Sequence, residues 1–345
     1  MGALMKKRSK KRKFDRNAAF SMNLANPNSD EKDAVQRMIS LEGKLFCFSG
    51  KSISEILTAE AIDPENEKPE TRHSYRVIYQ IGTENSFVAR TLIQAKKILD
   101  SVILREGLEK QKILNHVWTC AKLLFNCEES YHKIFTETTE LMHECDAIIS
   151  QYKTGSHVPP LPQVEYLEQH VVAFLGSAKR FLEASHKLLC IFYGSPCFES
   201  NFKSYREWMA ENKPNQKEIR HLLEQDKDWI QFIAWSRNAL DVNHSKPQFK
   251  VTIENFKFHK GNKFTNPCWS HDFREKTGGI KSEPSDIIND MNIYITNMLT
   301  FFEEVFLICI QDNWDSRYDF QLHKHTEKEV NMKCPCIYFA SLKLQ

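Results

Sequence analysis

Hydrophobic residues recur every three to four positions over most of the chain, which is the spacing of one face of an α-helix. With only 11 Gly and 12 Pro in 345 residues, few breakers interrupt these segments, and the pattern favours a mostly helical protein. We expect a kink or break inside the longest segment, 108–152. The predicted helices are about 86–105, 108–152, 162–193, 199–212, 216–244 and 284–312.

Two regions show strand character instead. Residues 44–48 and 75–81 are rich in β-formers and flank a loop with Pro and Glu, which predicts a small sheet or hairpin packed on the helices. Residues 248–258 alternate apolar and polar side chains, the period of a half-buried strand. Gly261-Asn262 supplies a turn, so 263–264 is predicted to return as the partner strand. The sequence therefore predicts a β-hairpin over about 247–266.

The clearest linker is the Pro- and Gly-containing stretch 154–162, and we place a domain boundary there. The predicted organisation is a disordered basic tail over 1–40, an N-terminal α(+β) domain over 41–153, a helical domain over 160–312 and a C-terminal extension over 313–345. The predicted fold class is mostly α: a C-terminal helical bundle with one inserted β-hairpin, preceded by a helical N-terminal domain with a small β element.

The charge is unevenly distributed. Seven of the eight residues from Lys6 to Lys13 are basic, so the formal net charge of +2 leaves about −5 for the remainder. A generally basic, nucleic-acid-coating surface is therefore excluded, and RNA contacts outside the tail require a local patch. The tail itself has two interpretations, a segment that binds RNA or an acidic partner and a solvated tail.

The cysteines and the lengths of the apolar segments suggest a cytoplasmic protein. The ten cysteines have no regular spacing, and no apolar h-region follows the basic stretch, so we expect reduced thiols in a cytoplasmic protein. No window approaches 18 apolar residues, and no membrane span is predicted. The absence of a P-loop, a Gly-rich dinucleotide motif and a nucleophile elbow gives no reason to expect a cofactor.

Two histidines and two cysteines near the end offer one metal-ligand set. His323, His325, Cys334 and Cys336 together are sufficient for a tetrahedral zinc site. Zinc modules usually separate paired cysteines by two residues, whereas a single proline separates this pair. The alternative, a short packed strand, is favoured.

Candidate chemistry is concentrated in the segment 235–244, with the sequence WSRNALDVNH. If the chain stays helical through it, seven residues are just under two turns, and Arg237 and His244 share one face. An arginine remains protonated, whereas a histidine titrates near neutral pH. Such a pair suits a phosphodiester: the arginine neutralises charge on oxygen, and the imidazole transfers a proton.

This pattern of arginine, asparagine and a later histidine resembles the R-x(4–6)-H signature of the HEPN superfamily, with six residues between Arg237 and His244. Members are all-helical domains, and many are metal-independent endoribonucleases. The resemblance covers roughly 160–312.

The resemblance implies a function and an assembly. Arg237, Asn238 and His244 would be the catalytic residues, with Asn238 orienting the phosphate or the imidazole, and no metal would take part. It also implies an RNA substrate, a toxin or antiviral defence setting, an inhibitory protein partner, and a homodimer whose two motifs line one cleft. The last long helix is the candidate for part of that interface.

A structural interpretation of the same residues stands beside the catalytic one. Asp241 follows Arg237 by four positions, so the arginine has an ion-pair partner on its own helix. His244 suits a helix C-terminus, where the dipole favours a cation. Under this interpretation the domain is a non-catalytic module for dimerisation or for binding RNA or protein.

Overall fold

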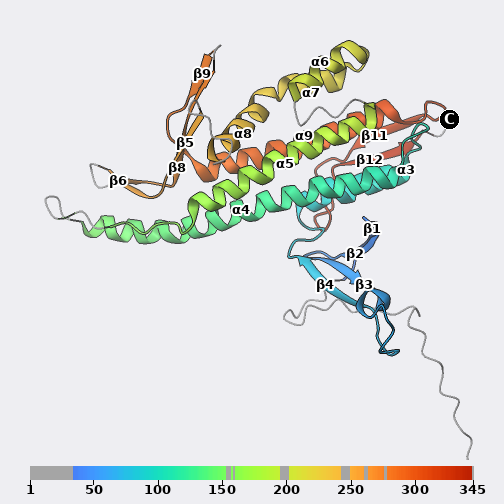
Figure 1. Ribbon diagram of the computed structural model, residues 1–345, viewed down its shortest axis with the longest axis horizontal. Helices are drawn as coiled ribbons and strands as arrows, with labels where there is room; N and C mark the ends of the chain where they lie inside the picture. The colour runs from blue at the N-terminus through green and yellow to red at the C-terminus, as the bar shows by residue number, and fades with distance from the viewer. Residues whose placement is uncertain are drawn as a thin grey trace, which may run out of the picture. The chain divides into compact units, whose positions relative to one another are not determined.

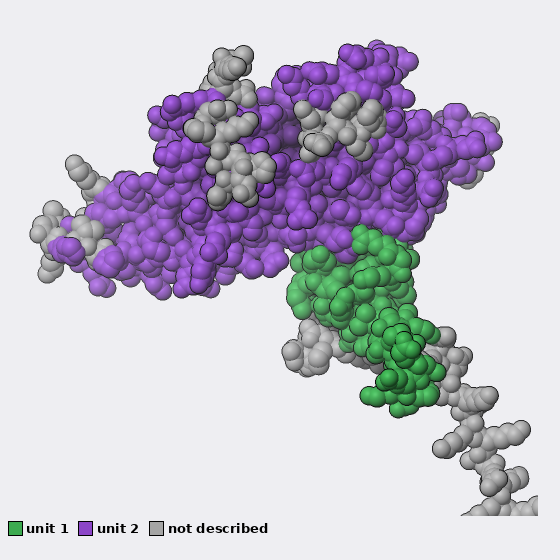
Figure 2. All heavy atoms as spheres, in the orientation of Figure 1, with its two compact units in different colours: residues 1–88, 331–335 green, residues 89–330, 336–345 purple. Residues whose placement is uncertain are grey.

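The computed structural model describes most of the chain outside the N-terminal tail. The described residues are 34–152, 157, 160–194, 202–241, 249–259, 263–275 and 278–343. The chain divides into two compact units, which Figure 2 colours separately. Unit 1 comprises Met1–Val88 and Asn331–Pro335, and unit 2 comprises Ala89–Val330 and Cys336–Gln345.

Unit 1 is built on a four-stranded antiparallel sheet in the order β1-β2-β3-β4. Its first hairpin turns through Glu42 and Gly43, whose φ angles of 51° and 76° are those of a two-residue turn that matches the twist of the strands. Thr83 ties the returning segment to this unit, because its Oγ1 donates to the carbonyl of Lys333 at 3.0 Å. The elements are β1 (Arg37–Leu41), β2 (Lys44–Phe48), β3 (Ile53–Leu57), α1 (Ala59–Ile62), β4 (Ser74–Tyr79) and α2 (Ser86–Val88).

Unit 2 is organised around three long helices, α4, α5 and α9, which lie side by side in Figure 1. The whole hydrophobic stripe predicted for the last helix is buried: Ile287, Met291, Ile295, Met298, Phe302, Val305, Phe306 and Ile310. The helices of unit 2 are a π-helical turn η1 (Ala89–Ile93), α3 (Gln94–Ser101), α4 (Lys110–Gln151), α5 (Leu167–Tyr193), α6 (Phe202–Asn212), α7 (Lys217–Gln225), α8 (Lys227–Leu240) and α9 (Ile287–Asn313).

Helix α9 is also the one described helix that is long and apolar enough to cross a membrane, with a mean hydropathy of 1.6 over its most apolar window. However, 61% of that window is buried inside the protein, as in the core helix of a soluble protein. Its start is fixed locally, because Asp286 Oδ1 accepts a hydrogen bond from the Asn289 amide at 2.9 Å.

The strands of unit 2 form three antiparallel sheets. The largest has the order β10-β8-β5, with β9 also paired to β8, while β6–β7 and β11–β12 are two-stranded. The strands are β5 (Phe249–Glu254), β6 (Lys257–His259), β7 (Lys263–Thr265), β8 (Cys268–Glu275), β9 (Gly278–Lys281), β10 (Ser285–Asp286), β11 (Phe320–Lys324) and β12 (Tyr338–Leu342).

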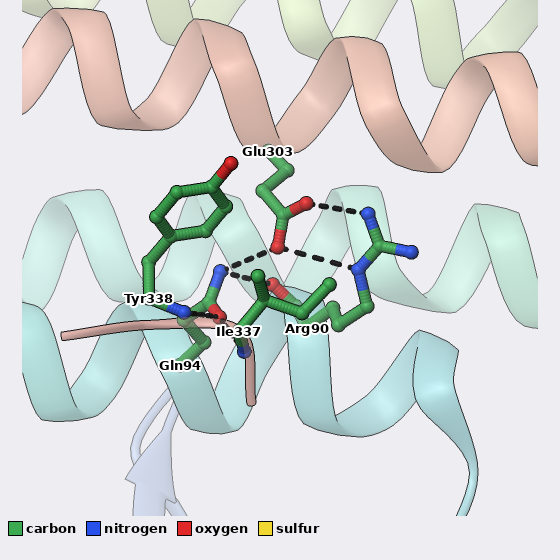
Figure 3. Close-up of polar contacts among 5 residues, drawn as sticks. All are labelled: Arg90, Gln94, Glu303, Ile337 and Tyr338. Carbon is green, nitrogen blue, oxygen red and sulfur yellow. Dashed lines mark hydrogen bonds and ion pairs between the residues drawn. The ribbon is translucent and has the colours of Figure 1, made fainter. Parts of the chain in front are cut away.

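A buried carboxylate joins distant parts of unit 2 (Figure 3). Glu303 of α9, only 4% exposed, pairs with Arg90 of η1 at 2.5 Å and accepts a hydrogen bond from Gln94 Nε2 at 2.7 Å. The other end of the Gln94 amide accepts from the backbone N–H groups of Ile337 and Tyr338, both at 2.7 Å. One carboxylate thus links the first helical turn of the unit, its last long helix and its C-terminal strand.

The predicted fold class is wrong. The protein is about 53% helical and 20% strand, and the strands of its described residues form four antiparallel sheets rather than one small element and one hairpin. Residues rich in β-formers identified β2 and β4, and alternation identified β5, but β8 was missed although its buried Trp269, His271 and Phe273 alternate with polar residues.

The pairing of the predicted hairpin is also wrong. Strand β5 pairs with β8, placing Phe249 opposite Phe273, and the predicted return strand at 263–264 belongs to β7, which pairs with β6. Strand β5 ends before Asn255. The side-chain amide of Asn255 accepts a hydrogen bond from the backbone N–H of Val164 at 3.1 Å and donates one to the carbonyl of Val164 at 2.9 Å. The predicted helix from residue 216 is likewise divided at Asp226 into α7 and α8.

The observed division differs from the predicted boundary at 154–162, most of which lies outside the described residues. Helices α4 and α5, on either side of it, pack along each other within unit 2, and the division falls between residues 88 and 89. Helix α4 also runs without the expected break through all of its 42 residues.

We predict that unit 2 depends on the charge of Glu303. The substitution Glu303→Gln removes this charge and leaves Arg90 without its buried counter-ion. We expect the free energy of unfolding to fall by about 3 kcal/mol. Urea denaturation followed by circular dichroism measures this change. The neighbouring Glu304 is exposed, so Glu304→Gln is the matched control, with an expected change below about 0.5 kcal/mol. Equal effects of the two substitutions would contradict the assigned role of Glu303.

Candidate nucleic-acid interface

Helices α5, α6 and α8 enclose a cleft of about 550 Å³ in unit 2. The cleft is of mixed character, with charged, amide and apolar side chains. Its lining residues are Lys179, Leu182 and Glu183 of α5, Phe202, Lys203 and Arg206 of α6, and Lys227, Asp228, Ile230, Gln231, Ala234, Trp235 and Asn238 of α8.

The contribution of α8 follows from helical geometry. Positions 227, 231, 234 and 238 are three or four residues apart and therefore share one face of the helix. The opposite side of α8 carries Ile233 and Ser236, which are fully buried. Helix α8 starts beside Asp226, whose Oδ1 accepts a hydrogen bond from Trp229 Nε1 at 2.7 Å.

The cleft is electropositive. Four basic side chains line it, Lys179, Lys203, Arg206 and Lys227, against only two acidic ones. Glu224, which does not line the cleft, pairs with Lys227 and lies 3.5 Å from Arg206. The hydrogen bond from Lys227 is the main cause that lowers the pKa of Glu224, so the glutamate stays ionised and moderates the positive charge.

Two aromatic side chains also line the cleft. Trp235 stacks on Phe249 with ring centroids 5.7 Å apart and an interplanar angle of 23°. That contact occupies one face of the indole and holds the ring in place. Phe202 is packed edge-on against Phe301 of α9 at 6.1 Å. Basic groups interleaved with fixed aromatic rings are the combination that binds single-stranded nucleic acids.

The structure places the three predicted catalytic residues differently. Asn238 lines the cleft, and its Oδ1 accepts a hydrogen bond from Lys179 Nζ at 3.1 Å. Arg237 lies about 100° further around the helix, outside the cleft lining, and forms an ion pair with Asp241. His244 lies outside the described residues.

Helix α8 ends before residue 244, the predicted end of the helix. Helix α8 ends at Leu240, and Asp241 already has extended backbone angles, with φ −86° and ψ 114°. A helical spacing of seven residues therefore does not relate Arg237 to His244, and that part of the prediction is wrong. The ion pair foreseen as the structural alternative is confirmed, since Asp241 lies within reach of Arg237.

Sequence reasoning missed the basic residues of the cleft. Lys179, Arg206 and Lys227 come from three helices, and no local motif unites them. Only Lys203 and Arg206 could have been grouped from the sequence, because their three-residue spacing puts both on one face of α6.

The possible zinc ligands near the C-terminus have other roles in the structure. His323 hydrogen-bonds Ser341 at 2.8 Å and stacks on Phe339 across the β11–β12 pair, which agrees with the packed strand. Cys336 is buried and lies 3.5 Å from the carbonyl of Ala89. Within the described residues, no three His, Cys, Asp or Glu side chains are grouped so as to hold a metal ion.

Comparison with known proteins provides no family. No protein-family model matches the chain, and neither the curated proteins nor the solved structures contain a match. The residues of the cleft therefore carry the functional argument.

We predict that the cleft binds single-stranded RNA through charge. Replacing Lys203 and Arg206 together by Gln removes two phosphate contacts, and the slope of log Kd against log salt should fall in magnitude by roughly 1.4. Fluorescence anisotropy with a labelled oligouridine at several salt concentrations measures the slope. Lys217→Gln, an exposed lysine on α7, is the matched control and should leave it unchanged. An unaltered slope in the double variant would place the RNA elsewhere.

Proposed function

We propose that the protein binds single-stranded RNA in the cleft between α5, α6 and α8 and cleaves it without a metal ion. The observation that carries this proposal is the basic, aromatic-lined cleft that reaches Asn238, a member of the Arg237-Asn238-His244 motif. A polyanion bound there would run past the C-terminal end of α8, where the motif begins.

Binding would use the two kinds of side chain in the cleft. Lys179, Lys203 and Arg206 line the cleft and would neutralise phosphates, which would give RNA affinity to a chain with little net charge. Trp235, which lines the cleft and is held by Phe249 and Phe273, would stack on a base. Because every base has a π-face, such stacking tolerates different sequences. We therefore expect modest base preference.

The chemical step needs no co-reactant. The ribose 2′-hydroxyl attacks the adjacent phosphorus, the bond from phosphorus to the 5′-oxygen breaks, and a 2′,3′-cyclic phosphate and a 5′-hydroxyl form. His244 would take the proton from the 2′-hydroxyl or return one to the departing 5′-oxygen. Arg237 would neutralise the charge that builds on the phosphoryl oxygens. Asn238 would orient the phosphate.

The ion pair with Asp241 is compatible with this role of Arg237. A guanidinium has five N–H donors, and Asp241 contacts one of its terminal nitrogens, Nη1. The arginine side chain remains 31% exposed, whereas the aspartate side chain is 14% exposed. Asp241 would thus hold the arginine in place while leaving donors for a phosphate.

A second function is favoured by the same contacts. Arg237 is paired with Asp241 and Asn238 with Lys179, so both side chains have partners within unit 2. In a non-catalytic module these contacts would stabilise the end of α8, and the cleft would bind RNA or an acidic protein segment without cutting it.

The cellular setting is part of the proposal. The nine described cysteines lie outside any disulfide, and most of them are buried, which suits a reducing compartment such as the cytoplasm. Metal-independent RNA cleavage fits a toxin or antiviral defence protein, whose activity an inhibitory protein partner would control.

We predict metal-independent cleavage that depends on the motif. In EDTA, the wild-type protein should cut single-stranded RNA and leave 2′,3′-cyclic phosphate ends. Resistance of these 3′ ends to periodate, together with mass spectrometry of the products, detects them. His244→Ala removes the proton-transfer group and should slow cleavage by roughly two to four orders of magnitude. Arg237→Lys keeps the charge but loses the planar fork and should be strongly impaired.

The matched control is His221→Ala, because His221 is an exposed histidine on α7 of the same unit. This variant should cut at the wild-type rate. Cleavage by none of the proteins, with RNA affinity retained, would favour the binding module. Cleavage that persists unchanged in His244→Ala and Arg237→Lys would refute the catalytic role of the motif.

A further inference from the structure

Strand β5 is an edge strand. In the sheet order β10-β8-β5 it pairs with β8 on one side, and no described residue forms a strand on its other side. An open edge presents unpaired backbone N–H and C=O groups, which are a template for another strand. Proteins usually protect such an edge with a bulge, a proline or an inward charge. Residues Phe249–Glu254 contain no proline, and their pairing to β8 is regular.

The pairing with β8 shows which groups of β5 point outward. His271 directs its carbonyl to the amide of Ser282 at 2.9 Å, on the side of β8 away from β5. Its partner across the ladder, Val251, therefore belongs to a non-hydrogen-bonded pair and turns its own N–H and C=O away from β8. By the same alternation, Phe249 and Ile253 also present their backbone groups at the open edge.

A hollow of about 670 Å³ lies along this edge. Ile253 and Asn255 line it on one side and the start of α5 on the other, mostly with apolar side chains such as Val164 and Leu167. Two large apolar residues there face solvent: Tyr166 is 65% exposed and Val172 is 41% exposed. Exposed apolar surface beside an unpaired edge is a protein interaction site.

We infer that β5 pairs edge to edge with β5 of a second copy of this chain. The sequence from Lys250 to Glu254, KVTIE, is complementary to itself when read antiparallel. With the two-fold axis at Thr252, Lys250 lies opposite the partner's Glu254, and the reciprocal pair forms at the other end. Opposite charges facing each other across strands stabilise a sheet, and both ion pairs form only in this register.

The backbone supports the same register. Val251 lies opposite the partner's Ile253, and both residues present their N–H and C=O groups at the open edge. The two residues therefore form a hydrogen-bonded pair, and the two-fold axis generates the equivalent pair of Ile253 with the partner's Val251. Because the axis is perpendicular to the sheet, apolar residues of both copies stay on the face that packs against the helices. The charged residues stay on the opposite face, where Lys250 is exposed.

This surface replaces the last long helix as the expected interface. The predicted stripe of α9 is buried within unit 2 and is unavailable to a partner. The β5 interface does not rest on RNA cleavage, so failure of the proposed enzymatic function would leave it intact.

Sedimentation velocity of the full chain between about 1 and 100 micromolar tests the inference. We expect the wild-type protein to dimerise in this range. Val251→Pro removes one outward N–H per copy without touching the bonds to β8, and it should raise Kd at least roughly tenfold. Lys250→Glu places two carboxylates opposite each other at both ends and should raise Kd by a similar factor.

A charge swap distinguishes pairing from misfolding. The double variant Lys250→Glu/Glu254→Lys restores the complementary charges across the axis, and its Kd should return to within about threefold of the wild-type value. Lys263→Glu, on β7, is the matched control and should dimerise normally. Circular dichroism melting confirms that each variant is folded. A wild-type monomer at the highest concentration would overturn the inference, as would folded Val251→Pro and Lys250→Glu variants that dimerise as tightly as wild type.

Discussion

The architecture of unit 2 depends on one buried carboxylate. Removing Glu303 from water costs free energy, and this cost is offset by the guanidinium of Arg90 and the amide of Gln94. Arg90 and Glu303 are 213 positions apart, so the interaction closes the unit between its first turn and its last long helix. Gln94 extends the link, because its oxygen receives the two backbone amides at the start of β12.

The same helix determines the shape of the candidate RNA cleft. Phe301 lies two residues before Glu303 and contacts Phe202 of α6 at 6.1 Å and Trp229 of α8 at 5.8 Å. Phe302 contacts Phe181 of α5 at 6.3 Å. All three walls of the cleft therefore rest on one turn of α9. The helices that carry the basic side chains of the cleft are thus packed on one aromatic layer.

The sequence predicted the long helices well because each buries a stripe with strong 3.6-residue periodicity. Helix α4 is continuous where a break was expected: it packs against α5 and α9, and nearly all of its buried side chains lie between Ile113 and Thr138. The strands were predicted poorly. Strand β8 was missed although its buried Trp269 and His271 alternate with polar residues, because the turn signal at Gly261-Asn262 assigned the return strand to 263–264.

The site was predicted only in part, for a different reason. The motif around Arg237 is local, and the ion pair with Asp241 follows from the four-residue spacing. The end of α8 at Leu240 has no glycine or proline to announce it, so the sequence favoured a longer helix. The cleft combines side chains from three helices, such as Lys179, Arg206 and Lys227. Their proximity results from tertiary packing, so the periodicity of a single segment cannot predict it.

The cleft between α5, α6 and α8 is the proposed site of RNA binding. Photo-crosslinking of the full chain to 4-thiouridine RNA, followed by mass spectrometry of the crosslinked peptides, locates the contact directly. The account predicts crosslinks to peptides of α6 and α8, with Phe202 or Trp235 among the modified residues, because these rings face the cleft. Crosslinks confined to the basic residues between Lys6 and Lys13, or to unit 1, would contradict it.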